Sequence, residues 1–259
     1  MKKKVVVTGM GIVCGLGKTV GEYFNNLLAG KSSIKKITKI DLSLHPTQIG
    51  GEITDFNAED YVDKKLIKRT DVFIHYALYC ADMAVKSACL DRDADKINKD
   101  KVGIIIGSGI GGMQTFDDTA VLHSTTGWKK VSPFFIPSLI TNMAGGQVAI
   151  NFGYRGNNYS ISTACATATH SIIEAYHTIM RGDCDIMLAG GSEAPMTRLA
   201  FSGFCAARAL SQRNEAPEKA SRPFDKGRDG FVMSEGSGVI VLESEESAIK
   251  RGAKIYAEV

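Results

Sequence analysis

One stretch decides the fold: YSISTACATATH, which runs from Tyr159 to His170. Its first three residues have the pattern of a short strand, and the periodic run that follows predicts a helix over residues 166–181. Cys165 therefore stands at the turn between a strand and a helix, with small side chains on both sides of it. A strand that leads directly into a helix is typical of a layered α/β fold.

The same alternation continues toward both ends of the chain. Short apolar runs bounded by glycine predict buried, mostly parallel strands at residues 5–7, 102–106, 159–161, 185–189 and 239–242, and the pattern of residues 253–259 is typical of one more. Helical periodicity predicts helices at residues 18–29, 70–90, 113–122, 137–151 and 166–181. In the second helix, Phe73, Ala77, Ala81 and Ala84 share one face, which we expect to be buried. Because no linker of low complexity interrupts the pattern, we expect a single domain over residues 1–259.

Composition excludes several classes of function. The 259 residues carry 31 Lys and Arg against 28 Asp and Glu, a dispersed net charge of +3 that does not favour nucleic-acid binding. No apolar run approaches the roughly 18 residues that a membrane span needs. The start of the chain, Met1–Lys4 followed by VVV, lacks the apolar core of a signal peptide, so we expect a cytoplasmic protein. The six cysteines lack the spacing of a zinc site, so we expect reduced thiols and no metal.

Two glycine clusters suggest nucleotide binding and fit it poorly. Gly11 and Gly17 are separated by five residues, one more than a phosphate loop allows. Gly107–Gly112 matches G-x-G-x-x-G, but the acidic residue expected about 20 positions later is missing. Tyr61 and Lys65 also have the Y-x-x-x-K spacing of some reductases, on what we expect to be an exposed helix. An NAD(P)-dependent oxidoreductase therefore remains an alternative.

Cys165 is the candidate nucleophile. The N-terminus of the following helix favours a thiolate by about 0.3–1 kcal/mol, which is a modest activation. His170 is rotated about 140° away from Cys165 on a helix, and His177 about 120°, so neither histidine is predicted to pair with the thiol. A small, buried, structural cysteine is the competing interpretation of Cys165.

Several motifs together resemble one family. They are Ser162-Thr163-Ala164-Cys165, DIMLAGGSE at 185–193, FCAARAL at 204–210, SRPFD at 221–225 and DGF at 229–231. They resemble the β-ketoacyl-[acyl-carrier-protein] synthases, most closely the elongating synthase II type, and the similarity extends along the entire chain. The resemblance implies a thiolase-like fold, of which this chain is the N-terminal βαβαβαββ half of a five-layer αβαβα arrangement. The second half is absent, so we expect a piece of a longer protein.

The resemblance also implies a reaction of fatty acid biosynthesis. Cys165 would take an acyl group from acyl carrier protein, and a decarboxylated malonyl group on the same carrier would then attack it to give a 3-oxoacyl product. Substrates of the family are attached covalently to the carrier's phosphopantetheine, and no separate cofactor is expected. The family's two histidines and lysine for decarboxylation lie in the second half, so we expect this chain alone to lack full turnover.

Further roles follow from the resemblance residue by residue. Ile110 and Phe204 match the gate and wall of the acyl pocket, and Phe135 matches a pocket residue contributed across a homodimer interface. Basic residues that meet the acidic carrier protein are matched by Lys129, Lys130 and Arg208, and Lys68 and Arg69 lie in a similar basic patch that we also assign to carrier binding. Ala166-Thr167-Ala168 departs from the Thr-Ser-Gly of many elongating members, which leaves the acyl preference open. A non-catalytic scaffold that dimerises and binds carrier protein is a further alternative.

Overall fold

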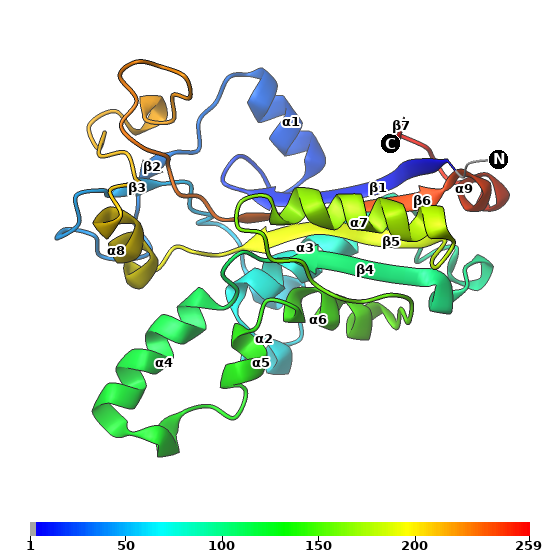
Figure 1. Cartoon of the computed structure of the whole chain (residues 1–259), viewed down its shortest axis with the longest axis horizontal. Helices are drawn as coiled ribbons and strands as arrows, with labels where there is room; N and C mark the ends of the chain where they lie inside the picture. Colours follow the sequence, from blue (N-terminus) through cyan, green and yellow to red (C-terminus); the bar gives the residue numbers. More distant parts are fainter. Residues whose placement is uncertain (1–3) are drawn as a thin grey trace.

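The computed structural model describes residues 4–259 and centres on a five-stranded sheet (Figure 1). Met1-Lys2-Lys3, part of the basic start of the chain, lie outside the described residues. The strands of the sheet follow the order β4-β5-β6-β1-β7. Their bounds are β1 Val5–Cys14, β4 Val102–Gly107, β5 Ile186–Glu193, β6 Gly236–Ser244 and β7 Ala257–Glu258. A small separate ribbon pairs β2 (Lys35–Lys36) with β3 (Ile49–Gly50).

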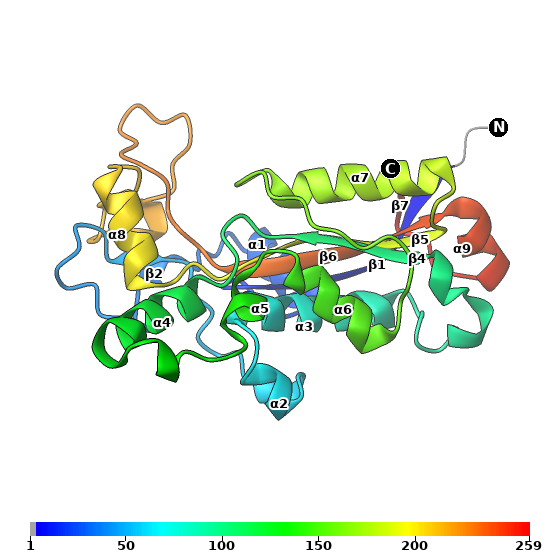
Figure 2. The same cartoon turned by 60° about the horizontal axis from the view of Figure 1, so that its bottom comes forward.

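Helices cover both faces of the sheet. Figure 2 shows α7 above it and α3, α5 and α6 below it, so the predicted layered α/β arrangement is confirmed. The bounds of the helices are α1 Val20–Leu28, α2 Lys64–Ile67, α3 Val72–Ser87, α4 Met113–Thr126, α5 Phe135–Leu139, α6 Met143–Phe152, α7 Thr167–Arg181, α8 Arg198–Ala206 and α9 Glu245–Arg251. Short 3₁₀ turns lie at 58–60, 94–96, 99–101, 128–130 and 217–219.

The sheet is mixed: β1, β4 and β5 run in the same direction, as predicted for mostly parallel strands, but β6 is inserted between β5 and β1 in the opposite direction. β4 and β5 pair in parallel, whereas β6 is antiparallel to both of its neighbours, β5 and β1, and β7 is antiparallel to β1. The reason lies in the connection from β5 to β6. Helix α8 and the loop after it lie beyond the end of β5, so β6 begins beside Glu193 and runs back along β5.

One predicted strand is reduced to a single bridge. Residues 159–161 form no strand, and Asn158 makes an isolated parallel bridge to Ile104 of β4. With this extended segment counted, the order is β1, α3, β4, α6, the Asn158 segment, α7, β5 and β6, which is the predicted βαβαβαββ pattern. The terminal strand predicted at 253–259 exists as the two-residue β7, paired with Val6 and Val7.

The helix predicted at 137–151 is divided into α5 and α6. Ile140 is extended, with φ −71° and ψ 138°, so the helix ends before it. The carbonyl of Leu139 accepts a hydrogen bond from the amide of Gly112 at 2.9 Å instead of one from a following helical turn. Contact with the loop before α4 therefore breaks a helix that local periodicity alone would continue.

Helix α3 is the centre of the larger core. Phe73, Ala77, Ala81 and Ala84, predicted to share a buried face, are all 0% exposed. The helix lies close to β1 because Gly11 has no side chain: a Cβ there would overlap the carbonyl oxygen of Cys80. This close approach holds β1 against the helix and fixes the end of the strand that reaches the site described below.

Gly11→Ala should therefore lower the free energy of unfolding by about 1–3 kcal/mol, because the added methyl group overpacks a backbone contact that cannot yield. Urea unfolding followed by circular dichroism measures the change. Gly21→Ala is the matched control: its Cβ would meet nothing within 4 Å, and alanine in a helix is favoured over glycine by up to about 1 kcal/mol. Equal stability of the two variants would contradict the packing argument.

Candidate active site

Cys165 lies in a tight turn immediately before α7. Ala164 has φ 52°, a left-handed conformation that costs a non-glycine residue energy and is found where the surroundings enforce it. The turn is closed by two backbone bonds, Ala166 N–H to Thr163 O at 3.2 Å and Thr167 N–H to Ala164 O at 3.1 Å. The Thr167 hydroxyl also accepts the Thr163 amide at 2.8 Å. This geometry places the Cys165 side chain in solvent at the N-terminal end of α7.

The environments of the six thiols differ in a way that favours Cys165. Burial raises the pKa of the Cys80 thiol to about 12 and also raises the pKa of Cys184, so both resist forming thiolates at neutral pH. Cys165 is exposed. The interpretation of Cys165 as a small buried residue is therefore wrong, because the turn carries its side chain outward instead of into the core.

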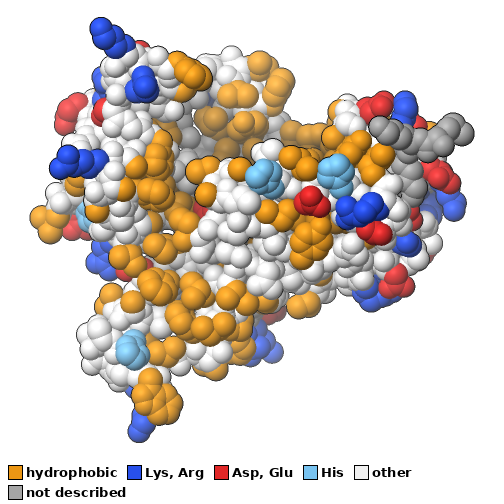
Figure 3. Space-filling view, viewed as in Figure 1, with side chains coloured by type: hydrophobic (Ala, Val, Ile, Leu, Met, Phe, Trp, Pro, Cys, Tyr) orange, Lys and Arg blue, Asp and Glu red, His pale blue; other side chains and the backbone are white. Residues whose placement is uncertain are grey.

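The thiol opens into a cavity of about 660 Å³ whose walls are mostly apolar. Ile110 and Phe204, the predicted gate and wall, line the same cavity as Cys165, and so does a second thiol, Cys14. A smaller cavity of about 340 Å³ lies between α4 and α8, and Ile110 and Phe204 line it as well. These two side chains therefore stand between the cavities. In the space-filling view, apolar side chains gather on α4 and toward α8 (Figure 3).

His170 and His75 make hydrogen bonds to threonine hydroxyls and not to the Cys165 thiol. His170 bonds through Nδ1 to the Thr163 hydroxyl at 2.8 Å, so it supports the turn, and among residues 4–259 no hydrogen bond joins Cys165 to a histidine. This agrees with the prediction from helical geometry. Burial lowers the pKa of His75 to about 4, which keeps that imidazole neutral at pH 7, bonded to the Thr70 hydroxyl.

The amides of the Gly107–Gly112 loop bind a carboxylate of the protein itself, where a dinucleotide fold would bind a pyrophosphate. The amides of Gly109 and Ile110 donate to the carboxylate of Glu193, at 2.7 and 3.2 Å. In a dinucleotide fold the amides of such a loop receive the pyrophosphate, whereas here an internal carboxylate already occupies them and would repel a second anion. Glu193 was not among the predicted site residues: the free amides of a glycine loop indicate that an acceptor lies nearby, but not which residue supplies it.

The Y-x-x-x-K pair likewise has a structural explanation. Tyr61 follows a short 3₁₀ turn and Lys65 belongs to the separate helix α2, so the expected shared helix does not exist. Tyr61 packs edge-on against Tyr79, with ring centroids 4.5 Å apart, and stacks on Phe56. Its ring is part of an aromatic cluster, which leaves the oxidoreductase alternative without a site.

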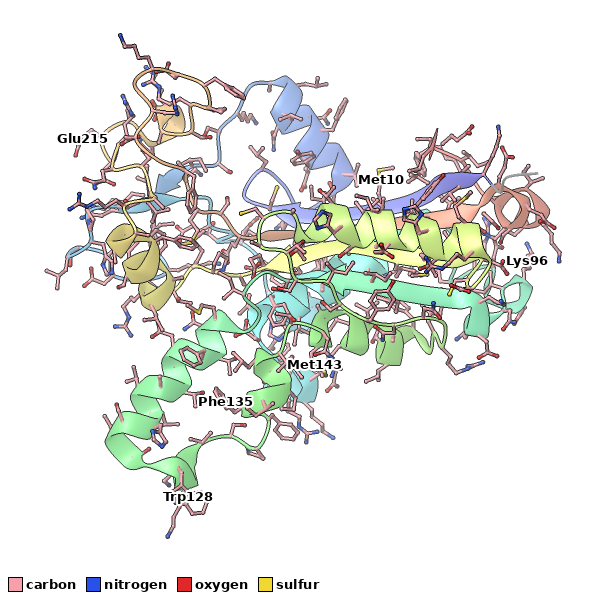
Figure 4. The ribbon with its side chains drawn as sticks, viewed as in Figure 1. Met10, Lys96, Trp128, Phe135, Met143 and Glu215 are labelled. Atoms are coloured by element: carbon pink, nitrogen blue, oxygen red, sulfur yellow. The ribbon has the colours of Figure 1, made fainter. Side chains whose placement is uncertain are left out.

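The remaining predicted residues lie outside the cavity. Phe135 is on α5, in an arm formed by α4 and α5 whose tip carries Trp128 (Figure 4). Lys129 and Lys130 are exposed at the same tip. Phe135 does not line the Cys165 cavity, and its role across an interface stays a prediction.

The other basic residues form two separate groups. Lys68 and Arg69 are exposed beside the arm, where the Arg69 guanidinium lies 4.5 Å from the centre of the Phe134 ring. Arg208 lies beyond α8 and lines a surface depression together with Arg222 and Arg228. The residues matched to carrier binding are thus exposed, but they do not make one continuous patch.

The described part of the chain also bears on metals and membranes. Across residues 4–259 no group of three or more His, Cys, Asp or Glu side chains is arranged to hold a metal ion. In the same range no helix is both long and apolar enough to cross a membrane.

Comparison with known proteins agrees with the geometry. The model of the family described as "Beta-ketoacyl synthase, N-terminal domain" matches residues 2–248. The chain belongs to the β-ketoacyl synthase family. The resemblance inferred from the motifs around Cys165 is confirmed by this match.

Individual relatives share about half of this β-ketoacyl synthase sequence. The 3-oxoacyl-[acyl-carrier-protein] synthase 2 of Staphylococcus aureus (strain COL) is 49% identical over 257 residues, which are 99% of this chain and 61% of the relative. The synthase 2 of Coxiella burnetii is 48% identical, covering 100% of this chain and 62% of the relative. The chain therefore spans about three fifths of the length of these curated relatives.

Solved structures give the same fold. A chain in the complex of a type II PKS acyl-carrier protein with its ketosynthase, bound to the hexaketide, superposes with a TM-score of 0.86 at 32% identity and is covered to 62%. The ishigamide ketosynthase/chain length factor superposes with a TM-score of 0.89 at 29% identity, again covered to 62%. The predicted thiolase-like fold of this β-ketoacyl synthase chain is confirmed.

Proposed function

We propose that this chain is the nucleophile-bearing part of a 3-oxoacyl-[acyl-carrier-protein] synthase that extends fatty acyl chains. The observation that carries the proposal is the exposed Cys165 thiol, held at the N-terminus of α7 and opening into an apolar cavity of about 660 Å³. An acyl thioester fits a nucleophile beside an apolar cavity. Its acyl chain can pack against the apolar walls, and its carbonyl carbon can be attacked by the thiolate. The curated relatives named 3-oxoacyl-[acyl-carrier-protein] synthase 2 support this assignment.

The first step of the proposed reaction is a thioester exchange. The Cys165 sulfur attacks the acyl carbonyl carbon, the bond from that carbon to the carrier's sulfur breaks, and the carrier thiol leaves with the proton that Cys165 loses. In the second step a malonyl group on another carrier loses CO₂, the resulting carbanion attacks the acyl carbonyl carbon on Cys165, and the bond from that carbon to the Cys165 sulfur breaks. The 3-oxoacyl carrier leaves, and the Cys165 thiolate takes up a proton from water to restore the thiol. Because this chain has no match to the family's two histidines and lysine, we assign it the first step only.

The walls of the cavity support an acyl substrate. We assign Ile110 and Phe204 to the acyl chain, because they stand between the cavity at Cys165 and the apolar cavity behind it. Phe135 would contribute to the acyl cavity of the partner subunit across a homodimer interface, since within its own chain it lies on the arm formed by α4 and α5. We further propose that residues 1–259 act as a single domain and that phosphopantetheine on the carrier replaces any separate cofactor.

Acyl transfer can be tested on the 259-residue chain itself. Incubation with an acyl-carrier-protein thioester should add the mass of the acyl group, and digestion should place it on the peptide containing Cys165. Intact mass spectrometry gives both results. An adduct on another cysteine, or none at Cys165, would overturn the proposal, and carrier binding without an adduct would favour a scaffold.

The basic residues at the tip of the arm predict a second result. Lys129→Glu with Lys130→Glu should weaken binding of the acidic carrier protein about tenfold at low salt, and less in high salt, because exposed charges attract a partner over about 10 Å and are screened by ions. Fluorescence anisotropy with a labelled carrier at two salt concentrations measures the effect. Lys250→Glu with Lys254→Glu, which reverses the same number of exposed charges at the other end of the molecule, is the matched control. Equal loss in both variants would place the carrier elsewhere.

A further inference from the structure

Glu193 lies on the wall of the Cys165 cavity and has no part in the proposed chemistry. It is the last residue of β5, and its carboxylate is turned toward the loop that connects β4 to α4. One oxygen, Oε2, accepts the Gly109 amide at 2.7 Å. The other, Oε1, accepts the Ser108 hydroxyl at 2.8 Å and the Ile110 amide at 3.2 Å. Three donors from consecutive residues thus converge on one carboxylate.

The next two amides of the loop, those of Gly111 and Gly112, also have hydrogen-bond acceptors. The Ser108 hydroxyl, which donates to Glu193, accepts the Gly111 amide at 2.9 Å. The Gly112 amide donates to Leu139 O at 2.9 Å. Bonds to an ionised acceptor are about twice as strong as neutral ones, so Glu193 dominates this set. The loop 108–111 therefore has its shape because a carboxylate lies at its centre.

This loop connects the nucleophile turn with the gate of the acyl cavity. A Cβ built on Gly109 would lie 2.9 Å from Glu193 Oε2 and 3.6 Å from the Cα of Ala164, the residue before Cys165. The next residue along, Ile110, stands between the two cavities. The position of the Ile110 side chain relative to the sulfur is therefore set by a backbone that Glu193 fixes.

We propose that Glu193 is a positioning residue that sets acyl-chain selectivity: its carboxylate holds the Ser108–Ile110 turn so that Ile110 remains as a wall between the two cavities. This inference rests on the proposed acyl function of the cavity. If the Ser108–Ile110 turn loosens, the Ile110 side chain can move aside. Longer acyl chains can then enter the smaller cavity. Glu193 touches no reacting atom in this scheme and acts through Ile110.

Alkylation of Cys165 by N-butylmaleimide and N-octylmaleimide tests the inference without requiring acyl transfer. The rate ratio of the octyl to the butyl reagent, measured at the Cys165 peptide, reports the cavity and cancels changes in the thiol itself. In Glu193→Gln, an isosteric amide that cannot accept all three donors, the ratio should rise about fivefold, which corresponds to roughly 1 kcal/mol of lost positioning. Thermal unfolding of the variant checks that it is folded. Glu218→Gln, an exposed glutamate in the loop after α8, is the matched control.

A double variant distinguishes positioning from a general loosening of the site. In an Ile110→Ala background the wall is already removed, so Glu193→Gln should no longer change the ratio. An unchanged or lower ratio in the single variant would overturn the inference, and so would an effect that persists without Ile110. Failure of acyl transfer at Cys165 would overturn the proposed function and leave the alkylation ratio measurable, so the two failures are distinguishable.

Discussion

Replacing Cys165 by alanine should abolish acylation of this chain, with the rate of adduct formation falling by roughly 10³-fold or more, as expected when a covalent nucleophile is removed. The physical reason is that no neighbouring thiol can take its place in the turn before α7. The fold should be preserved, since Cys165 is exposed and its side chain packs into no core. Intact mass after incubation with an acyl-carrier thioester measures the loss, and circular dichroism checks the fold.

Cys14 provides the sharpest control for this experiment, because it lines the same cavity. Cys14→Ala should acylate at a rate close to that of the unchanged chain if Cys165 is the nucleophile. An adduct that survives in Cys165→Ala and disappears in Cys14→Ala would show that Cys14 is the nucleophile and would contradict the assignment to Cys165. Cys80 offers no such rescue, since burial raises the pKa of its thiol to about 12.

Arg251→Ala should have the largest effect on stability, lowering the free energy of unfolding by about 3–5 kcal/mol. Arg251 makes two parallel bonds to the carboxylate of Glu243, Nε to Oε1 at 2.8 Å and one terminal nitrogen to Oε2 at 2.7 Å. Its other terminal nitrogen donates to Ala88 O at 2.6 Å. The side chains of the pair are 3% and 0% exposed, so alanine would leave the Glu243 carboxylate buried without a counter-charge. Urea unfolding measures the loss.

Two further variants test whether the cost arises from the unpaired charge. Arg251→Met combined with Glu243→Leu removes both charges of this pair and should recover at least half of the lost stability, because a well-packed apolar pair avoids the desolvation penalty. Asp93, whose carboxylate lies 3.4 Å from Arg251, keeps Arg92 and Lys96 as counter-charges in this variant. Lys86→Ala breaks an exposed pair with Asp82 and should change stability by less than about 1 kcal/mol. A small effect of Arg251→Ala, similar to that of Lys86→Ala, would contradict the argument.

Local patterns predicted which segments are buried, and long-range contacts decided what the patterns could not. The face of α3 through Phe73 and Ala84 followed from periodicity, because a buried helix needs apolar residues at that spacing. The direction of β6 did not, since apolar runs are alike in parallel and antiparallel strands. The break at Ile140 was likewise invisible, because it depends on an amide at Gly112, far along the chain.

The site divides in the same way. The neighbours of Cys165 made it a candidate nucleophile but left a buried structural cysteine open, and the family resemblance was needed to prefer it and to name Ile110 and Phe204. Glu193 could not be assigned a role. Its bonds to Gly109 and Ile110 join segments more than 80 residues apart, with separations of 84 and 83 positions, and no local pattern reports such a pairing.

The position of β7 has a practical consequence for handling the protein. β7 pairs with Val6 and Val7 at the start of β1, and the Lys4 ammonium lies 3.3 Å from the Glu258 carboxylate, so both flanks of the described chain meet at one edge of the sheet. The cavity is lined by Ile12 to Cys14, at the opposite end of the same strand. A fluorophore or a surface tether attached to a residue at either flank is therefore held away from the thiol and leaves the mouth of the cavity free.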